Sequence, residues 1–293
     1  MPTETVENRQ QLPSAVVRRD IVAGPRRLVP SGWTQLLSHL PTSRFVTART
    51  AYSYGGLAST EDELARLIVG SARHRWRYST RAVTLCSNRR RADLMRGIEA
   101  VGMEHLTSAL ATGRGIVLTS VHLSDFDLGG SWISQVSGRE VVAVVGGPCP
   151  RLREAAFNRI RRTCAVLVRR EEVTRIADLV GDLARGRIVS LMLDRHPQTG
   201  GAEVEFFGRR AVLSAAPLIL ARRTGAPVIV GGLKAQETGG HLVRIAPTSA
   251  VTTSNSGVAW LQGITRQLED LIRWAPDQWH IPPRIAQLPW GDH

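Results

Sequence analysis

The fold is decided by the stretch GRGIVLTSVHLSDFDLGG, residues 113–130. Within it, Ile116 to Leu118 is a short apolar run with β-branched side chains and a glycine in front, a pattern typical of a buried strand. A few residues later, Ser124 or Asp125 can cap a new helix. His122 therefore lies where a strand passes into a helix, which is the usual place for active groups in open α/β sheets.

The same stretch pairs this histidine with a carboxylate, because Asp127 follows His122 by five residues. This spacing is a poor match to one face of a regular helix, but the side chains meet if His122 lies in the turn and Asp127 in the first helical turn. A carboxylate beside an imidazole fixes its tautomer, so the other ring nitrogen can take a proton from a hydroxyl or amine. Taken alone, the spacing favours the alternative of a core histidine and a helix-capping aspartate, since two residues at one spacing occur often by chance.

Apolar runs and amphipathic segments alternate along the rest of the chain. The apolar runs predict further strands at 141–145, 165–168, 188–193, 227–231 and 242–245. The other segments predict helices at 103–112, 151–162, 173–183, 217–223 and 258–274. Strands that alternate with helices predict an α/β fold, with a mainly parallel central sheet flanked by helices on both faces.

The N-terminal part of the sequence differs from this pattern. Residues 1–30 mix polar residues, proline and arginine without periodicity, so we expect a mobile arm. Residues 31–293 then form a single domain, in which 31–100 are helical and basic and 101–293 are an α/β catalytic core. Helices in the N-terminal part are predicted at 33–40, at 45–55 and from 59 onward.

Basic residues outnumber acidic ones, with 38 lysines and arginines against 25 aspartates and glutamates and a formal net charge of +13. Lys234 is the only lysine, which fits the codon bias of a GC-rich genome, but that bias does not explain the excess of base over acid. The segment from residue 66 to residue 96 contains nine arginines and one acid, Asp93, and Trp76 and Tyr78 lie among the arginines. This segment is either a solvated helical face or an interfacial patch for an anionic membrane.

Composition argues against several other classes of protein and site. Only 5% of the residues are aromatic and no nucleic-acid module signature is present, so nucleic acid is a poor partner. The histidines and the three cysteines lack metal-ligand spacing, so we expect no metal. No apolar run of about 18 residues exists, so we expect no transmembrane helix, and we expect the polar N-terminus not to be a signal peptide. We therefore expect a cytoplasmic protein with peripheral contact at the inner face of the cell membrane.

Several motifs occur together in a fixed order. They are Gly102–Leu106, Gly113–Gly115, the box His122–Asp127, Asp194-Arg195, Val204–Gly208, Thr224–Val228 and Trp274–Trp279. In this order they resemble the lysophospholipid acyltransferase superfamily, and more closely its bacterial branch of late lipid A acyltransferases and phosphatidylinositol mannoside acyltransferases. The resemblance covers roughly residues 95–284. Two places depart from the family: Asp125-Phe126 replaces the frequent Asn-Trp of the box, and the usual Trp/His-Arg-Arg ending is reduced to residues 280–284.

The resemblance also implies a set of site residues. His122 is the general base, and the carboxylate that holds it is either Asp127, by box spacing, or Glu203, which precedes the block Phe206–Gly208. If Glu203 holds the histidine, Asp127 braces the loop through backbone N–H groups. For Glu203 the alternative is alternation along a half-exposed strand, and for Arg161 it is one more solvated arginine. The substrate-binding residues are Ser124, Arg161, Asp194 and Arg195.

The function implied by the resemblance is transfer of a fatty acyl group from an acyl thioester, carried by coenzyme A or by an acyl carrier protein. The acceptor is a hydroxyl or amine of a glycolipid or a related molecule. The thioester is a co-substrate, so no further cofactor is expected. The positive charge fits phosphate-bearing substrates, an acidic carrier protein and an anionic membrane. Two alternatives stay open: a non-catalytic peripheral membrane or carrier-protein-binding module on the same fold, and an acyltransferase for a secondary-metabolite intermediate.

Overall fold

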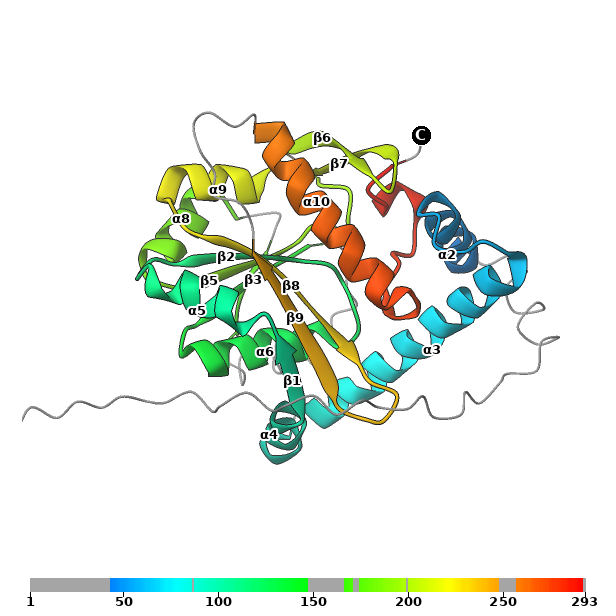
Figure 1. Cartoon of the computed structure of the whole chain (residues 1–293), viewed down its shortest axis with the longest axis horizontal. Helices are drawn as coiled ribbons and strands as arrows, with labels where there is room; N and C mark the ends of the chain where they lie inside the picture. The colour runs from blue at the N-terminus through cyan, green and yellow to red at the C-terminus, as the bar shows by residue number, and fades with distance from the viewer. Residues whose placement is uncertain are drawn as a thin grey trace, which may run out of the picture.

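A sheet of seven strands forms the centre of the computed structural model of this protein (Figure 1). The strand order is β1-β9-β8-β2-β5-β3-β4. The strands are β1 Ile98–Val101, β2 Ile116–Ser120, β3 Val141–Val145, β4 Val166–Arg170, β5 Ile188–Met192, β8 Val228–Ala235 and β9 His241–Pro247. The five strands from β8 to β4 run parallel, while β9 returns antiparallel to β8 and pairs in parallel with β1. The predicted mainly parallel sheet is confirmed.

The structure describes residues 43–85, 87–146, 166–170, 174–198, 200–247 and 257–291. The arm predicted at 1–30, the helices predicted at 33–40 and 151–162, and Arg161 lie outside these residues. Within them, the sequence did not predict β1, because it has only four residues and Glu99 interrupts them, so they form no apolar run. A separate antiparallel hairpin is made by β6 Gly201–Phe206 and β7 Arg209–Ser214. The alternative interpretation of Glu203, as part of a half-exposed strand, is therefore confirmed.

Helices cover both faces of the sheet because successive residues of a strand point to opposite sides. The flanking helices are α5 Met103–Ala111, α6 Phe126–Ser137, α8 Ile176–Ala184, α9 Ala216–Thr224 and α10 Gly257–Trp274. Ile116 and Leu118 of β2 share one buried cluster with residues of α5 and α6. Val117, which lies between them, belongs to a second cluster with residues of α8, α9 and α10. The predicted placement of helices on both faces is confirmed.

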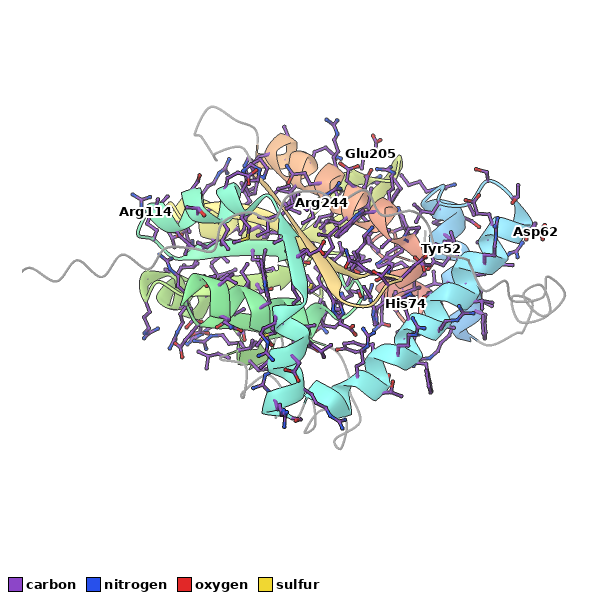
Figure 2. All side chains as sticks on the ribbon, turned by 60° about the horizontal axis from the view of Figure 1, so that its bottom comes forward. Tyr52, Asp62, His74, Arg114, Glu205 and Arg244 are labelled. Atoms are coloured by element: carbon purple, nitrogen blue, oxygen red, sulfur yellow. The ribbon has the colours of Figure 1, made fainter. Side chains whose placement is uncertain are left out.

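A helical N-terminal part packs against a segment near the end of the chain. It consists of α2 Ser43–Tyr54, α3 Glu61–Leu85 and α4 Asn88–Arg96. The hydroxyl of Tyr52 in α2 donates to the carbonyl of Pro276 at 2.8 Å. His74 of α3 lies 3.5 Å from the carboxylate of Asp277. Figure 2 shows Tyr52 and His74 on the side of the molecule where α2 and α3 lie. In the described part of the chain, no helix is both long enough and apolar enough to cross a bilayer.

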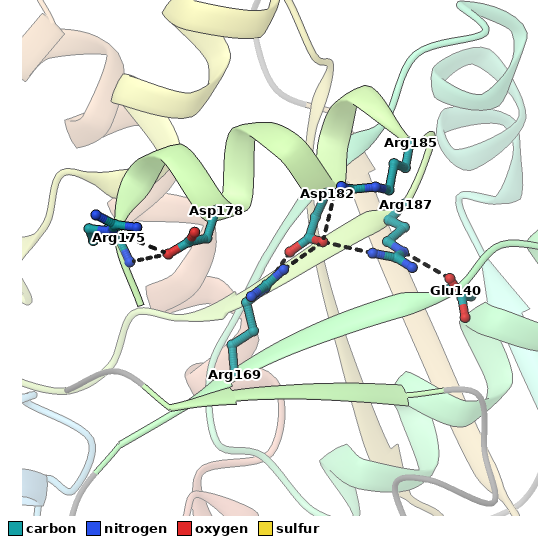
Figure 3. A network of polar contacts seen from close by, with 7 residues as sticks. All are labelled: Glu140, Arg169, Arg175, Asp178, Asp182, Arg185 and Arg187. Carbon is teal, nitrogen blue, oxygen red and sulfur yellow. Dashed lines mark hydrogen bonds and ion pairs between the residues drawn. The ribbon is translucent and has the colours of Figure 1, made fainter. Parts of the chain in front are cut away.

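The amino end of β5 is tied to its neighbours by a network of charged residues around Asp182 (Figure 3). Asp182, near the end of α8, is fully buried. It accepts hydrogen bonds from Arg169 of β4 at 2.5 and 2.9 Å and from Arg187 at 2.9 Å. Arg187 also donates to Glu140 at 2.8 Å. The network therefore links α8 and β4 to the residues that precede β3 and β5.

Candidate active site

Two neighbouring strands bring a histidine and an aspartate together at the carboxyl edge of the sheet. β2 and β5 pair in parallel register, with Ser120 opposite Met192. His122 and Asp194 each follow this pair by two residues, so the register carries both side chains to the same place. The Nδ1 atom of His122 lies 2.7 Å from Oδ1 of Asp194. This edge of an α/β sheet is where active groups commonly gather.

Asp194 is a buried and ionised partner for this histidine. None of its side chain is exposed, and its Oδ2 accepts hydrogen bonds from Trp279 Nε1 at 2.8 Å and from Arg195 Nη1 at 3.0 Å. Burial acts to raise the pKa of Asp194, but the charges of Arg195 and His122 and the hydrogen bonds from His122 and Trp279 outweigh it. The result is a pKa held well below the usual range of an aspartate.

This pairing determines what His122 can do chemically. An ionised carboxylate only accepts hydrogen bonds, so the proton of the neutral imidazole lies on Nδ1 and the lone pair lies on Nε2. The His122 side chain keeps 27% of its surface exposed, whereas Asp194 keeps none. A histidine held in this way can take a proton at Nε2 from a substrate hydroxyl or amine.

The predicted orienting carboxylates, Asp127 and Glu203, lie elsewhere, so this part of the prediction is wrong. Asp127, in the first turn of α6, accepts a hydrogen bond from the Tyr78 hydroxyl at 2.5 Å. The turn and the start of α6 direct the Asp127 carboxylate toward α3 and away from His122. Glu203 lies on the exposed face of the β6–β7 hairpin and forms an ion pair with Arg210 of β7.

The residues predicted to bind substrate also need correction. Asp194 is buried against His122, so direct contact with substrate is ruled out in this arrangement. Ser124 is 3% exposed and its Oγ accepts a hydrogen bond from the Ala235 N–H at 3.0 Å. Its hydroxyl therefore binds the protein backbone and does not face a substrate. Arg195 donates to the Asp194 carbonyl at 3.0 Å and to the His280 carbonyl. Its predicted contact with substrate stays a prediction, as does that of Arg161, which lies outside the described residues.

A segment near the end of the chain straps the box His122–Asp127 in place. Ser124 N–H donates to the Gln278 carbonyl at 2.9 Å, and His280 N–H donates to the His122 carbonyl at 2.8 Å. Between these two bonds, Trp279 forms an isolated antiparallel bridge with Leu123 and is fully buried. Ser124 has a left-handed backbone, with φ of +51°, which lets the loop make the turn between strand and helix. The backbone around His122 is therefore fixed from both sides.

Three aromatic side chains lie close to His122 or to one another beside it. The ring of Phe126 lies edge-on to His122 at 5.1 Å and is stacked with Tyr78 at 5.1 Å. His280 lies edge-on to Tyr78 at 4.8 Å. Burial, together with the charges of His122 and Arg75, lowers the pKa of His280 to about 3. His280 is therefore a neutral neighbour of His122 at physiological pH.

Sequence reasoning missed the contributions of Tyr78 and His280, since each lies far along the chain from the box. The sequence did point to Asp194, because this residue follows an apolar run that is predicted to be a strand, as His122 does. Placing it required knowledge that these two strands are neighbours. Among the described residues, no three side chains of histidine, cysteine, aspartate or glutamate converge as a metal site would require.

Known proteins share these features of sequence. A sequence profile for the family described as bacterial lipid A biosynthesis acyltransferase matches residues 60–283. The chain is 27% identical over 239 residues to the phosphatidylinositol mannoside acyltransferase of Mycolicibacterium smegmatis, a match that covers 79% of this chain and 75% of that relative. It is 28% identical over 238 residues to the phosphatidylinositol mannoside acyltransferase of Mycobacterium tuberculosis, strain CDC 1551 / Oshkosh, which covers 79% and 73%. Because the family match runs from α3 through the box to the strapping segment, this chain belongs to the bacterial lipid A biosynthesis acyltransferase family and is an acyltransferase.

Proposed function

We propose that this enzyme transfers a fatty acyl group from an acyl thioester, carried by coenzyme A or an acyl carrier protein, to a hydroxyl or amine of a glycolipid or related acceptor. Family membership supplies the reaction class. The observation that carries the mechanism is the 2.7 Å contact between His122 Nδ1 and Asp194 Oδ1, in which the His122 side chain keeps 27% of its surface exposed.

In the proposed reaction, Nε2 of His122 takes the proton of the acceptor hydroxyl or amine as its oxygen or nitrogen attacks the thioester carbonyl. Asp194 stabilises the imidazolium that forms. The helix α6 begins inside the box, at Phe126, and the positive end of its dipole is suited to stabilise the oxyanion. The intermediate then expels the thiolate, which takes the proton back from His122. No acyl-enzyme is formed, and placing the two substrates is most of the task.

The names of the relatives suggest an acceptor to test first, a mannosylated phosphatidylinositol. A lipid A precursor and a small hydroxyl or amine intermediate follow it in the test. All three classes present a nucleophile that general-base assistance by His122 would activate, so the mechanism is the same for each.

We further propose that the enzyme works at the inner face of the cell membrane through one side of α3. Trp76 is 68% exposed there, and Arg73 and Arg77 are exposed beside it at helical spacing. An indole among arginines suits an interface with anionic headgroups. Two further arginines of α3 are engaged with the protein, since Arg75 donates to the Ile281 carbonyl at 2.9 Å and Arg81 pairs with Asp125.

The proposed reaction is tested by acyl transfer from palmitoyl-coenzyme A or palmitoyl-acyl carrier protein, with mass detection of the acylated acceptor. We expect transfer by the native chain and a rate lower by about 10²–10⁴-fold for His122→Ala, because that is the usual worth of general-base assistance. A folded His122→Ala protein that transfers at the native rate would show the mechanism to be wrong. No transfer from either donor to any acceptor would favour a non-catalytic binding module.

The proposed membrane contact is tested by sedimentation with vesicles of phosphatidylcholine alone or mixed with phosphatidylglycerol. We expect binding to the anionic vesicles that weakens in high salt, because ions screen headgroup attraction. Arg73→Gln with Arg77→Gln should weaken binding by about 1 kcal/mol per arginine. The matched control is Arg223→Gln with Arg266→Gln, which removes the same charge from exposed positions of α9 and α10. Equal binding to both kinds of vesicle at every salt concentration contradicts the proposal.

A further inference from the structure

Two residues of α3 hold the two acids of the box. The Tyr78 hydroxyl donates to Oδ2 of Asp127 at 2.5 Å, and Nη1 of Arg81 donates to Oδ2 of Asp125. Tyr78 and Arg81 are three residues apart, so they project from the same side of the helix. Asp125 and Asp127 flank Phe126, at the point where the His122 loop enters α6. A helix that lies outside the α/β core in sequence therefore grips the box at two points.

The carboxylate of Asp125 is buried, so it needs its contact with Arg81. Asp125 is 4% exposed, and besides Arg81 it contacts His241 Nε2 at 2.8 Å. Burial acts to raise the pKa of Asp125, but the hydrogen bond from His241 and the charge of Arg81 outweigh it, and this pKa is lowered. Asp125 is a buried carboxylate, and a buried charge needs a partner of opposite sign.

The Tyr78 contact reaches His122 through one intervening ring. Tyr78 is stacked on Phe126 at 5.1 Å with 26° between the planes, and Phe126 lies edge-on to His122 at 5.1 Å. Tyr78 is itself 6% exposed, so α3 seals this side of the loop. A displaced Tyr78 would free Phe126 to move, and Phe126 bounds one side of the His122 ring.

We infer that Tyr78 and Arg81 are positioning residues for His122: by holding Asp127 and Asp125, α3 fixes the loop that sets the direction of the catalytic imidazole. The N-terminal helical part is then a component of the active site and does more than approach the membrane. This inference rests on the proposed function for its consequence in catalysis. The anchoring of the loop can be measured independently of any activity.

The first experiment replaces Tyr78 by phenylalanine, which removes the hydroxyl and keeps the ring that stacks on Phe126. The matched control is Ser79→Ala, an exposed position one residue further along the same helix. With palmitoyl-coenzyme A and phosphatidylinositol mannoside, we expect kcat to fall about tenfold for Tyr78→Phe, because a hydrogen bond to a charged group is lost. Both KM values should stay near native, and the control should match the native enzyme. If Tyr78→Phe changes only KM or only the melting temperature and leaves kcat at the native value, the inference is overturned.

The second experiment tests the other anchor with a rescue. Arg81→Gln leaves Asp125 buried without its guanidinium, so both the melting temperature and kcat should fall. In the double variant Arg81→Gln with Asp125→Asn the buried charge is gone, and an amide pair can bridge the same gap. We expect the double variant to recover most of the kcat that the single variant loses. No recovery in a protein whose melting temperature is restored overturns the role of Arg81.

The third measurement needs no turnover. Hydrogen–deuterium exchange of backbone amides in residues 119–128 should be faster in Tyr78→Phe than in the native chain, and native-like in Ser79→Ala. Unchanged exchange in Tyr78→Phe overturns the inference, whatever its effect on kcat. If the native chain transfers no acyl group, the proposed function fails, while faster exchange in Tyr78→Phe still shows that α3 holds the loop. The two failures are thus distinguishable.

Discussion

Asp194 and Asp182 are two fully buried aspartates at opposite ends of β5, and they differ in their partners. Asp194 follows the strand and contacts His122, Trp279 and Arg195. Asp182 precedes the strand and is surrounded by arginines (Figure 3). Both carboxylates have a lowered pKa, because burial acts to raise it and the neighbouring charges and hydrogen bonds outweigh the burial. Burial and charge alone therefore do not distinguish the two ends of the strand.

The difference lies in what each partner can do with a proton. Guanidinium groups stay charged at every physiological pH and only donate hydrogen bonds. A carboxylate among arginines is thus neutralised and immobile, which suits a structural link between α8, β4 and β5. An imidazole gains and loses a proton near neutral pH, so the carboxylate beside His122 can direct a base. In this fold, the histidine identifies the end of β5 at which a proton can be transferred, whereas a buried carboxylate by itself does not.

The largest expected effect separates the two ends by activity. Asp194→Asn should lower kcat by about 10²–10⁴-fold, within the usual worth of general-base assistance. Trp279 and Arg195 both donate to Asp194, so the new amide would keep its oxygen toward them and turn its NH₂ toward His122. Nδ1 of His122 would then accept a hydrogen bond, and the ring proton would move to Nε2, where the base is needed. The measurement is acyl transfer by protein of native circular dichroism.

The control for this variant is Glu203→Gln, which changes the other carboxylate that sequence reasoning placed beside His122. Glu203 is paired with Arg210 on the exposed face of the β6–β7 hairpin, and an exposed ion pair contributes about 0–1 kcal/mol to stability. We expect kcat and stability to stay close to native. If Glu203→Gln slows transfer as much as Asp194→Asn does, the assignment of the orienting carboxylate is wrong.

The sequence predicted the strands of the central sheet except β1, the box and the class of reaction, because these depend on local periodicity and motifs. It misplaced the orienting carboxylate because that choice depends on strand order. β5 lies beside β2 although β3 and β4 separate them along the chain. The position of Glu203 before the block Phe206–Gly208 made it a candidate, but the chain leaves the sheet after Asp194 and forms the β6–β7 hairpin.

The contacts from α3 were beyond sequence reasoning for a similar reason. Tyr78 and Asp127 are separated by 49 residues, and Arg81 and Asp125 by 44. No local pattern connects them. The arginines of α3 look alike in sequence, yet Arg73 and Arg77 are exposed whereas Arg81 pairs with a buried aspartate. Only the packing of α3 against the box distinguishes them.

The next effect is on stability at the structural end of β5. Asp182→Asn should lower the free energy of unfolding by about 2–4 kcal/mol, at the lower end of the cost of breaking a buried ion pair, because its arginines reach solvent. Arg169 and Arg187 keep 33% and 23% of their side chains exposed. Turnover per folded molecule should stay within about twofold of native, since neither arginine contacts the box.

Urea unfolding measures this change, and Glu140→Gln is the matched control. Glu140 pairs with Arg187 in the same network but is 50% exposed, so its loss should cost about 0–1 kcal/mol. If Asp182→Asn lowers kcat as Asp194→Asn does, at equal folded fraction, then the two ends of β5 are coupled and the comparison fails.

The smallest effect, and the sharpest form of the comparison, is the pH dependence of the stability lost in Asp182→Asn. The folded pKa of Asp182 lies below the unfolded value of about 3.9, because Arg169 and Arg187 outweigh the effect of burial. Its contribution to stability is therefore complete above the unfolded pKa and is lost as the pH falls toward the folded pKa. The difference in unfolding free energy between the native chain and Asp182→Asn should be constant above about pH 5 and should narrow below about pH 4.

A second group titrates in this range but cancels from that difference. The folded pKa of His280 is lowered by burial to about 3, below its unfolded value of about 6.5. The unfolded chain therefore binds more protons between these values, and both proteins lose stability as the pH falls from about 6.5. Because His280 is present in both and lies at the other end of β5, its loss should be equal in the two. Urea unfolding at pH 7, 5, 4 and 3 measures the difference. A difference that narrows already between pH 7 and 5 would contradict the assignment of this stability to the lowered pKa of Asp182.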